Sequence, residues 1–284
     1  LIMSIQLIAD SCCDTTPELQ QRLGLVKAPL KINIAGGKTY IDDGGVDIPT
    51  LIADMKASKS AASSACPSPE EFAELMRPCD ECFVVTLSSK LSGSYNAARN
   101  ARDLVLEDEP GKRIHILDSA SASAGETRLA LFAQACLDAG NDFDTAVRRA
   151  ESFAAGMRTL FVLEDLSALV KSGRLNKVSG IVASILSLCP VLGADGHGEI
   201  KMVAKARGMQ NALRRLTEIV GQETAGAPPR SVTMVLAHCQ AEERAESLKM
   251  QLKASCPAIG KVLMVPTGIL STMYVGNGGI VVAF

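Results

Sequence analysis

The fold is decided by residues 82–94, whose sequence is CFVVTLSSKLSGS. Residues 82–87 form a continuous apolar run, which is typical of a parallel strand that is buried on both faces. The hydroxyl-rich loop 88–94 follows directly, and it leads into a helical pattern over residues 92–107. A buried strand, a short polar loop and a helix in this order indicate the α/β class.

The same alternation extends to both sides of this stretch. Short apolar runs predict strands over residues 5–9, 26–34 and 114–117, and a periodic pattern predicts a helix over residues 125–139. Ser68 and Glu71 have the spacing of a capping box at the start of another helix. We therefore expect a mostly parallel sheet in the first half of the chain.

The pattern changes after about residue 158. Asp195-Gly196-His197-Gly198 lies between two apolar segments and predicts a hairpin. The chain therefore divides into two α/β domains, which we place at residues 1–160 and 161–284. The further elements expected in the second domain are strands at 160–163, 232–237, 262–265 and 280–283 and helices at 166–171, 179–188 and 208–220.

The composition excludes several classes of function. The 29 lysines and arginines are balanced by 31 aspartates and glutamates, which argues against a protein that binds nucleic acid. Aromatic residues make up 4 % of the chain and tryptophan is absent, so a base-stacking surface is not expected. No apolar run reaches the roughly 18 residues of a membrane span. The surplus of apolar residues is aliphatic, and it fills a core or lines a site for an aliphatic ligand.

The cysteines and histidines give no metal site. Nine cysteines at irregular spacings predict reduced thiols in a cytoplasmic protein. Cys79 and Cys82 have a metal-like spacing, but no second pair or histidine lies near them in the sequence, so we interpret them as core thiols. His115, His197 and His238 fall in a strand, at a hairpin tip and at a strand end.

Hydroxyl-rich loops follow three of the expected strands. These loops begin at Asp10-Ser11, at Ser88 and at Asp118, and each leads into a helix. The carboxyl ends of parallel strands meet at one edge of the sheet, and helix N-termini there favour anions. A carboxylate or phosphate headgroup is therefore expected. Ordinary helix capping is the alternative interpretation of these hydroxyls.

Four segments of the chain resemble the DegV family of bacterial lipid-binding proteins. Residues 86–95, TLSSKLSGSY, are very similar to the family's Leu-Ser-Gly-Thr-Tyr signature. Residues 8–11 resemble its opening Asp-Ser loop, residues 64–69 its Thr-Ser-Gln-Pro-Ser segment, and residues 169–175 its Lys-Gly-Gly-Arg-Ile turn. The order and spacing of these segments hold over nearly the whole chain.

The resemblance implies a two-domain fold and a lipid ligand. The first domain would be a parallel three-layer α/β/α unit, and the second a smaller α/β unit with a mixed sheet. A long-chain fatty acid such as palmitate, stearate or oleate would lie in a tunnel at their interface. Some family members are the lipid-binding subunit of bacterial fatty acid kinase, and a separate ATP-binding subunit phosphorylates the carboxylate for phospholipid synthesis. The resemblance thus implies a non-catalytic carrier without a cofactor, and it allows transient contact with a membrane surface.

The resemblance also implies the ligand-binding residues. Ser64 and Ser92 would hold the carboxylate together with the helix start at Gly93 and Ser94, and Arg174 would lie near the mouth. Tyr274 occupies the position of a family histidine, and Cys66 replaces a family glutamine. The aliphatic residues of one further segment could line the tunnel or be ordinary core residues, and they are Ile181, Val182, Ile185, Leu186 and Leu188.

Two other functions stay open from the sequence. One is an acyl-transferring enzyme with Ser92 as its nucleophile, although no base is evident and no nucleophile-elbow motif surrounds any serine. The other is a module that binds a small phosphorylated or hydroxylated anion, although no glycine-rich phosphate loop is present.

Overall fold

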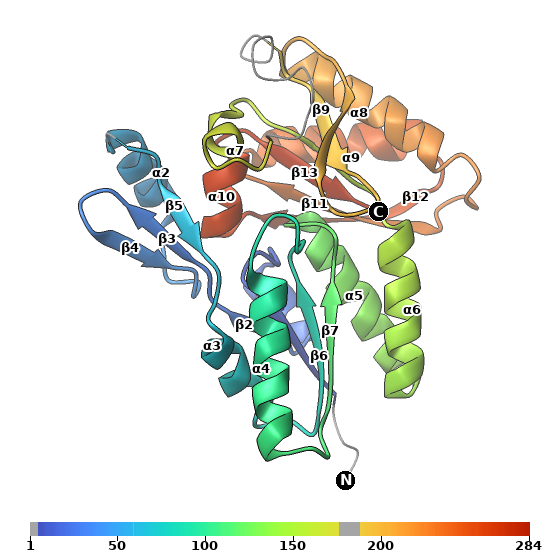
Figure 1. Cartoon of the computed structure of the whole chain (residues 1–284). Coiled ribbons are helices and arrows are strands. Elements are labelled where there is room, and N and C mark those ends of the chain that lie inside the picture. Colours follow the sequence, from blue (N-terminus) through green and yellow to red (C-terminus); the bar gives the residue numbers. More distant parts are fainter. Residues whose placement is uncertain (1–4, 59, 176–187) are drawn as a thin grey trace.

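The computed structural model describes residues 5–58, 60–175 and 188–284, and their strands form three sheets (Figure 1). Two large sheets lie one above the other, and a small sheet projects beside them. The strands are β1 (Gln6–Asp10), β2 (Val26–Ala28), β3 (Lys31–Ile34), β4 (Lys38–Ile41), β5 (Ser63–Ala65), β6 (Glu81–Thr86), β7 (Arg113–Asp118), β8 (Thr159–Val162), β9 (Val191–Ala194), β10 (Ile200–Ala204), β11 (Val232–His238), β12 (Ile259–Pro266) and β13 (Ile280–Ala283).

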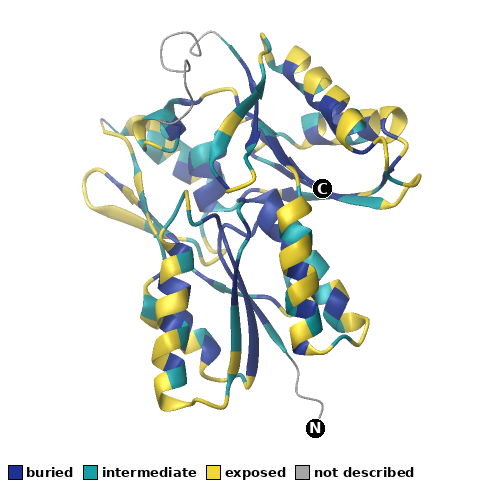
Figure 2. Ribbon diagram, turned by 45° about the vertical axis from the view of Figure 1, so that its right-hand side comes forward, coloured by how far each residue is buried: buried dark blue, intermediate teal, exposed yellow. Residues whose placement is uncertain are grey.

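Most of the helices pack against the large sheets with one side buried and the other exposed (Figure 2). The helices are α1 (Pro17–Arg22), α2 (Ile48–Ala57), α3 (Pro69–Met76), α4 (Ser94–Asp108), α5 (Ala124–Asp138), α6 (Phe143–Gly156), α7 (Ser167–Lys171), α8 (Met209–Glu223), α9 (Glu242–Ser255) and α10 (Ile269–Val275). In the described part of the chain, none of them combines the length and the apolar character needed to cross a membrane.

The first large sheet has the order β2-β1-β6-β7, and all of its strands are parallel. Every residue of β6 is buried, as the apolar run predicts. Phe83 and Val85 pack with α5 on one face, whereas Cys82 and Val84 pack with α3 and α4 on the other. This alternation gives three layers, and it confirms the parallel α/β/α architecture expected for the first half.

The second large sheet is mixed, with the order β10-β9-β8-β13-β11-β12. Only β11 and β12 pair in parallel, and the other neighbouring pairs are antiparallel. Helices α8 and α9 cover one face, and α5 contacts β11 and β13 on the other. The mixed sheet expected for the second half is thereby confirmed. Helix α5 also contacts β1 and β6, so one helix packs against both large sheets.

The prediction of a single strand over residues 26–34 is wrong. Strand β2 ends at Ala28 and belongs to the parallel sheet, whereas β3 begins at Lys31 and pairs with β4 and β5. Pro29 lies at the break and has no N–H to donate to a strand neighbour. The N–H of Leu30 donates instead to the Ser11 hydroxyl over 2.9 Å.

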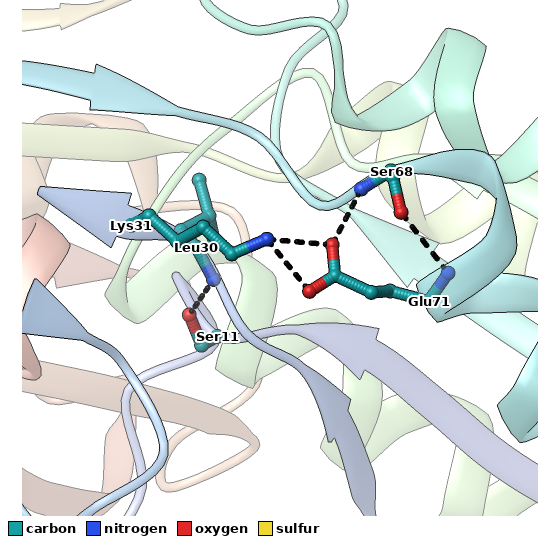
Figure 3. Close-up of polar contacts among 5 residues, drawn as sticks. All are labelled: Ser11, Leu30, Lys31, Ser68 and Glu71. Atoms are coloured by element: carbon teal, nitrogen blue, oxygen red, sulfur yellow. Dashed lines mark hydrogen bonds and ion pairs between the residues drawn. The ribbon is translucent and has the colours of Figure 1, made fainter. Parts of the chain in front are cut away.

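After Pro29, an ion pair holds the chain in its new direction (Figure 3). Lys31 Nζ lies 2.6 Å from a carboxylate oxygen of Glu71. The Glu71 carboxylate also accepts the Ser68 N–H, and the Ser68 hydroxyl accepts the Glu71 N–H, so the predicted capping box of α3 is confirmed. The start of α3 thus anchors the small sheet beside the parallel one.

Candidate functional site

A pocket lies among the strand ends of the parallel sheet, the mixed sheet, α7 and α10. Most of its wall is apolar. The apolar lining residues are Cys12, Leu30, Leu87, Leu91, Ala122, Phe161, Leu163, Leu169, Ala194, Ile200, Leu270, Val275 and Val281. The polar lining residues are Ser64, Ser92, Ser121, Ser123, Thr159, Arg174, Glu199, Ser271 and Tyr274, and Gly198 adds backbone to the wall.

Four of the six ligand-binding residues expected from the resemblance line this pocket. They are Ser64, Ser92, Arg174 and Tyr274. Gly93 and Ser94 are next to Ser92 in sequence, but they do not appear among the described lining residues. Of the candidate tunnel residues, Ile181, Val182, Ile185 and Leu186 lie outside the described residues. Leu188 is described and half-buried, but it does not line the pocket.

Ser64 and Tyr274 meet across the pocket from distant parts of the chain. Ser64 lies on β5, opposite Ile32 of β3, and Tyr274 lies on α10. Their hydroxyl oxygens are 2.9 Å apart. A phenol hydroxyl can donate one hydrogen bond and also accept.

Arg174 brings a positive charge to the same group of side chains. Gly173, at a φ of 77°, ends the short helix α7 and turns the chain toward the pocket. The Arg174 side chain then donates from Nε to the Leu91 carbonyl over 3.3 Å and from Nη1 to the Ser172 carbonyl over 2.9 Å. Its guanidinium lies 5.6 Å from the centre of the Tyr274 ring. The cation is thus fixed over an aromatic face, which is a favourable arrangement.

Ser92 lies in the loop between β6 and the N-terminus of α4. Its N–H donates to the Ser88 carbonyl over 3.1 Å, and its hydroxyl accepts the Ser94 N–H over 3.2 Å. A side chain at Gly93 would meet Cys66 Sγ at 3.0 Å, so the loop packs closely against the segment that follows Ser64. The first amide groups of a helix have no partner within the helix, and here the Ser92 hydroxyl accepts the one from Ser94.

The three hydroxyl-rich loops meet as the sequence predicts. The Ser88 N–H donates to the Ser121 carbonyl over 2.7 Å, and the Leu87 N–H donates to Asp10 over 2.9 Å. Ser11 accepts the Leu30 N–H, and the Ser121 and Thr159 hydroxyls lie 2.7 Å apart. Several of these hydroxyls are therefore hydrogen-bonded within the protein, as are those of Ser64 and Ser92, which share the pocket wall with Arg174.

A group of fully buried acids lies behind the pocket, and the sequence gives no sign of its burial. Desolvation raises the pKa of Asp10 to about 6 and that of Asp14 to about 6. It also raises the pKa of Glu126 well above the usual range of a carboxyl group, and neighbouring Asp10 adds to this effect. Asp14 accepts the Gly268 N–H over 2.7 Å and the Ser123 hydroxyl over 2.5 Å, so it connects the β1 loop to the start of α10.

Ser92 has no base beside it in the part of the chain that the structure describes. Its hydroxyl donates to the Ser94 hydroxyl over 3.4 Å, and none of the three histidines lines the pocket. A nucleophilic serine needs a general base within hydrogen-bond reach. The geometry thus favours binding over acyl transfer.

Known proteins are similar to this chain along nearly all of its length. A family model described as "Uncharacterised protein, DegV family" matches residues 4–284. A DegV domain-containing protein from Streptococcus pyogenes is 32 % identical over 284 residues, which cover 99 % of each chain.

Two solved structures are also close. A DegV family protein from Ruminococcus gnavus, refined with vaccenic acid, is 36 % identical with a TM-score of 0.93, and the match covers 99 % of this chain and 100 % of that one. The Fatty Acid Kinase (Fak) B3 protein of Streptococcus pneumoniae, loaded with linoleic acid, is 30 % identical with a TM-score of 0.89, and the match covers 99 % of both chains.

Proposed function

The chain belongs to the DegV family, and on this premise we propose that it is a carrier that binds one long-chain fatty acid. One observation carries the proposal. A largely apolar pocket brings Ser64, Ser92, Arg174 and Tyr274 together on its wall. An amphipathic ligand with a single anionic headgroup matches this division of the wall. The relatives that contain vaccenic acid and linoleic acid support the same class of ligand.

The carboxylate would lie against the polar group. The Ser64 and Ser92 hydroxyls would donate to it, with the start of α4 at Gly93 and Ser94 behind them, and Tyr274 would complete the contacts through Ser64. A buried carboxylate without partners would cost several kcal/mol, and charge-assisted hydrogen bonds offset this cost. Arg174 adds a fixed positive charge next to the Tyr274 ring.

The acyl chain would lie along the aliphatic wall formed by residues such as Leu87, Leu163, Leu270 and Val281. Each buried CH₂ group contributes ~0.8 kcal/mol, so a chain of about 15 such groups contributes about 12 kcal/mol before the costs of ordering. The Ser121 and Thr159 hydroxyls in this wall bond to each other and therefore need no polar partner from the ligand.

The carrier would act together with a separate kinase subunit. No phosphate-binding glycine motif is present in the sequence, so the ATP chemistry would come from the partner. The kinase named for the Streptococcus pneumoniae relative supports this pairing. Phosphorylation by an ATP-dependent subunit would occur in the cytoplasm, and we propose this location. We further propose that the chain forms two domains, residues 1–160 and 161–284, and that the pocket lies at their interface.

Ligand identification tests the proposal. The purified protein is denatured, its organic extract is analysed by mass spectrometry, and the delipidated protein is titrated with palmitate and oleate. We expect one fatty acid per chain and saturable uptake. Absence of both would overturn the proposal. Covalent labelling of Ser92 by a fluorophosphonate would instead favour acyl transfer, and binding of a small phosphorylated compound in place of a fatty acid would favour the anion-binding alternative.

A further inference from the structure

Glu126 is a fully buried acid without a donor to neutralise it. It lies in the first turn of α5, and its exposed fraction is 0 %. Among the described residues, neither of its carboxyl oxygens accepts a hydrogen bond from an N–H or O–H group. It also forms no ion pair with a lysine or arginine of that part of the chain. A charged carboxylate in such surroundings would be very costly.

Asp10 lies beside Glu126 but, unlike Glu126, it accepts hydrogen bonds from the protein. One of its oxygens accepts the Cys12 N–H over 3.0 Å, and the other accepts the Leu87 N–H over 2.9 Å. Leu87 opens the loop that carries Ser92, because β6 ends at Thr86. Asp10 therefore holds that loop at its start.

A carboxyl oxygen of Asp10 and one of Glu126 lie within 4.8 Å of each other, and we infer a hydrogen bond between the two acids. Two carboxyl groups form such a bond only when one of them carries a proton. The backbone donors around Asp10 stabilise its charge, whereas Glu126 has none. The other titratable groups that face Glu126 are Asp14, Cys12 and Cys13, and none of them is a cation.

We propose that Glu126 is a positioning residue, which stays a neutral acid and donates its proton to Asp10, so that Asp10 keeps the Ser92 loop in place. The inference rests on the proposed function, because Ser92 is the group that would meet the ligand carboxylate. Glu126 would then act on the loop that carries Ser92 through Asp10 and the Leu87 N–H that Asp10 accepts. The state of a residue behind the pocket is thereby connected to a residue on its wall.

A divalent cation is the competing way to neutralise this pair. Oxygens of Asp10 and Glu126 and the sulfur of Cys12 all lie within 4.8 Å of one another. Both Asp10 oxygens are, however, already hydrogen-bonded, and Cys12 Sγ accepts the Ser123 N–H over 3.4 Å. A metal ion would also require the Cys12 thiolate, and burial raises the pKa of this thiol. The arrangement thus favours a proton.

Infrared difference spectroscopy of the ligand-free protein tests the proton directly. At pH 7.5 we expect the wild type minus Glu126→Gln spectrum to contain the carbonyl band of a neutral carboxylic acid. Glu107→Gln, which changes an exposed glutamate on α4, serves as the control and should give only carboxylate bands. Carboxylate bands alone for Glu126, or stoichiometric binding of added Zn²⁺ or Ca²⁺ that Glu126→Gln abolishes, would overturn the proposal.

Oleate affinity tests the positioning role. Glu126→Gln keeps a donor toward Asp10 and should bind within about twofold of the wild type, whereas Glu126→Leu lacks the donor and should bind about tenfold more weakly. In a protein that already carries Ser92→Ala, Glu126→Leu should not weaken oleate binding further, because both substitutions act through the same loop. Equal affinities for the Gln and Leu variants would overturn the positioning role.

A third variant keeps the test decisive if Glu126→Leu does not fold. Asp10→Asn removes the charge that accepts the Leu87 N–H, and its effect on affinity should likewise be absent in the Ser92→Ala background. Additive effects would contradict an action through the Ser92 loop. A wild type that binds no oleate would refute the proposed function, and the ligand-free infrared result would still decide the state of Glu126.

Discussion

The hydroxyl oxygens of Ser64 and Tyr274 lie 2.9 Å apart although 210 residues separate them in the chain. The pair joins the small sheet to α10 at the wall of the pocket. The Tyr274 ring also lies next to the Arg174 guanidinium. One side chain therefore orients both a neutral donor and a cation of the proposed headgroup site.

Replacement of Tyr274 by histidine should make fatty-acid affinity depend on pH. An imidazole with a pKa near 6.5 gains a positive charge below that pH, and the charge attracts the ligand carboxylate. We expect the affinity of Tyr274→His, relative to the wild type, to fall by about tenfold as the pH rises from 5.5 to 7.5. Calorimetric titration with oleate across this range measures the ratio. A constant ratio would place residue 274 outside the headgroup site.

Ser92→Ala should weaken fatty-acid binding by roughly 1–3 kcal/mol, because a buried carboxylate would lose a hydrogen-bond donor. Ser255→Ala, an exposed change at the end of α9, is the matched control and should leave affinity unchanged. Fluorescence displacement of a labelled fatty acid gives both values. If Ser92→Ala binds as tightly as the control, the carboxylate must lie elsewhere.

The stability of the protein should fall as the pH rises from 6.5 to 8. The pKa of Glu126 is raised by burial, so this acid is neutral in the fold and ionised in the unfolded chain. Folding then takes up one proton, and the free energy of unfolding drops by about 1.4 kcal/mol per pH unit while Glu126 stays neutral in the fold. The carboxyls of Asp10 and Asp14, with pKa values of about 6, have the same sign but act mainly below this window.

Urea unfolding at several pH values measures the effect of Glu126. The free energy of unfolding of the wild type should decrease over this window, and Glu126→Gln should remove most of the decrease. Glu107→Gln should show the wild-type slope. A wild-type slope that survives in Glu126→Gln would assign the bound proton to another group.

Gly198→Ala should destabilise the protein by about 2–4 kcal/mol, since the residue combines a left-handed backbone with a close contact. Its φ is 85°, and an added Cβ would lie 2.3 Å from Ser88 Oγ and 2.9 Å from Ala120 Cα. The Gly198 carbonyl also accepts the Ser88 hydroxyl over 2.8 Å. Gly196→Ala, in the same turn with nothing within 4 Å, is the control. Similar urea midpoints for the two variants would contradict this packing.

The sequence predicts the elements whose signals are local. The apolar run at 82–87 becomes the buried strand β6, the Ser68 capping box begins α3, and the turn at 195–198 joins β9 to β10. Helices α6, α9 and α10 were not expected from the sequence. Strand β5 was also missed, because Ser63-Ser64-Ala65 has no apolar alternation and exists as a strand only through its pairing with β3.

The proposed site also has residues that the sequence indicates and one that it does not. The DegV resemblance indicates Ser64, Ser92, Arg174 and Tyr274, and the structure brings all four to one pocket. Glu126 could not be found in this way, since it has the position of an ordinary acid in the first turn of a helix. Its burial depends on the packing of α5 against both large sheets, which is a property of the tertiary fold.

That dual packing of α5 also has a kinetic consequence. The two sheets share one 15-residue helix, so they cannot be drawn apart there without breaking its contacts with β6 on one side and β11 on the other. An acyl chain would therefore both enter and leave the pocket slowly, and its residence time would be long. The cargo would then remain with its carrier between encounters, and its release would depend on the partner that receives it.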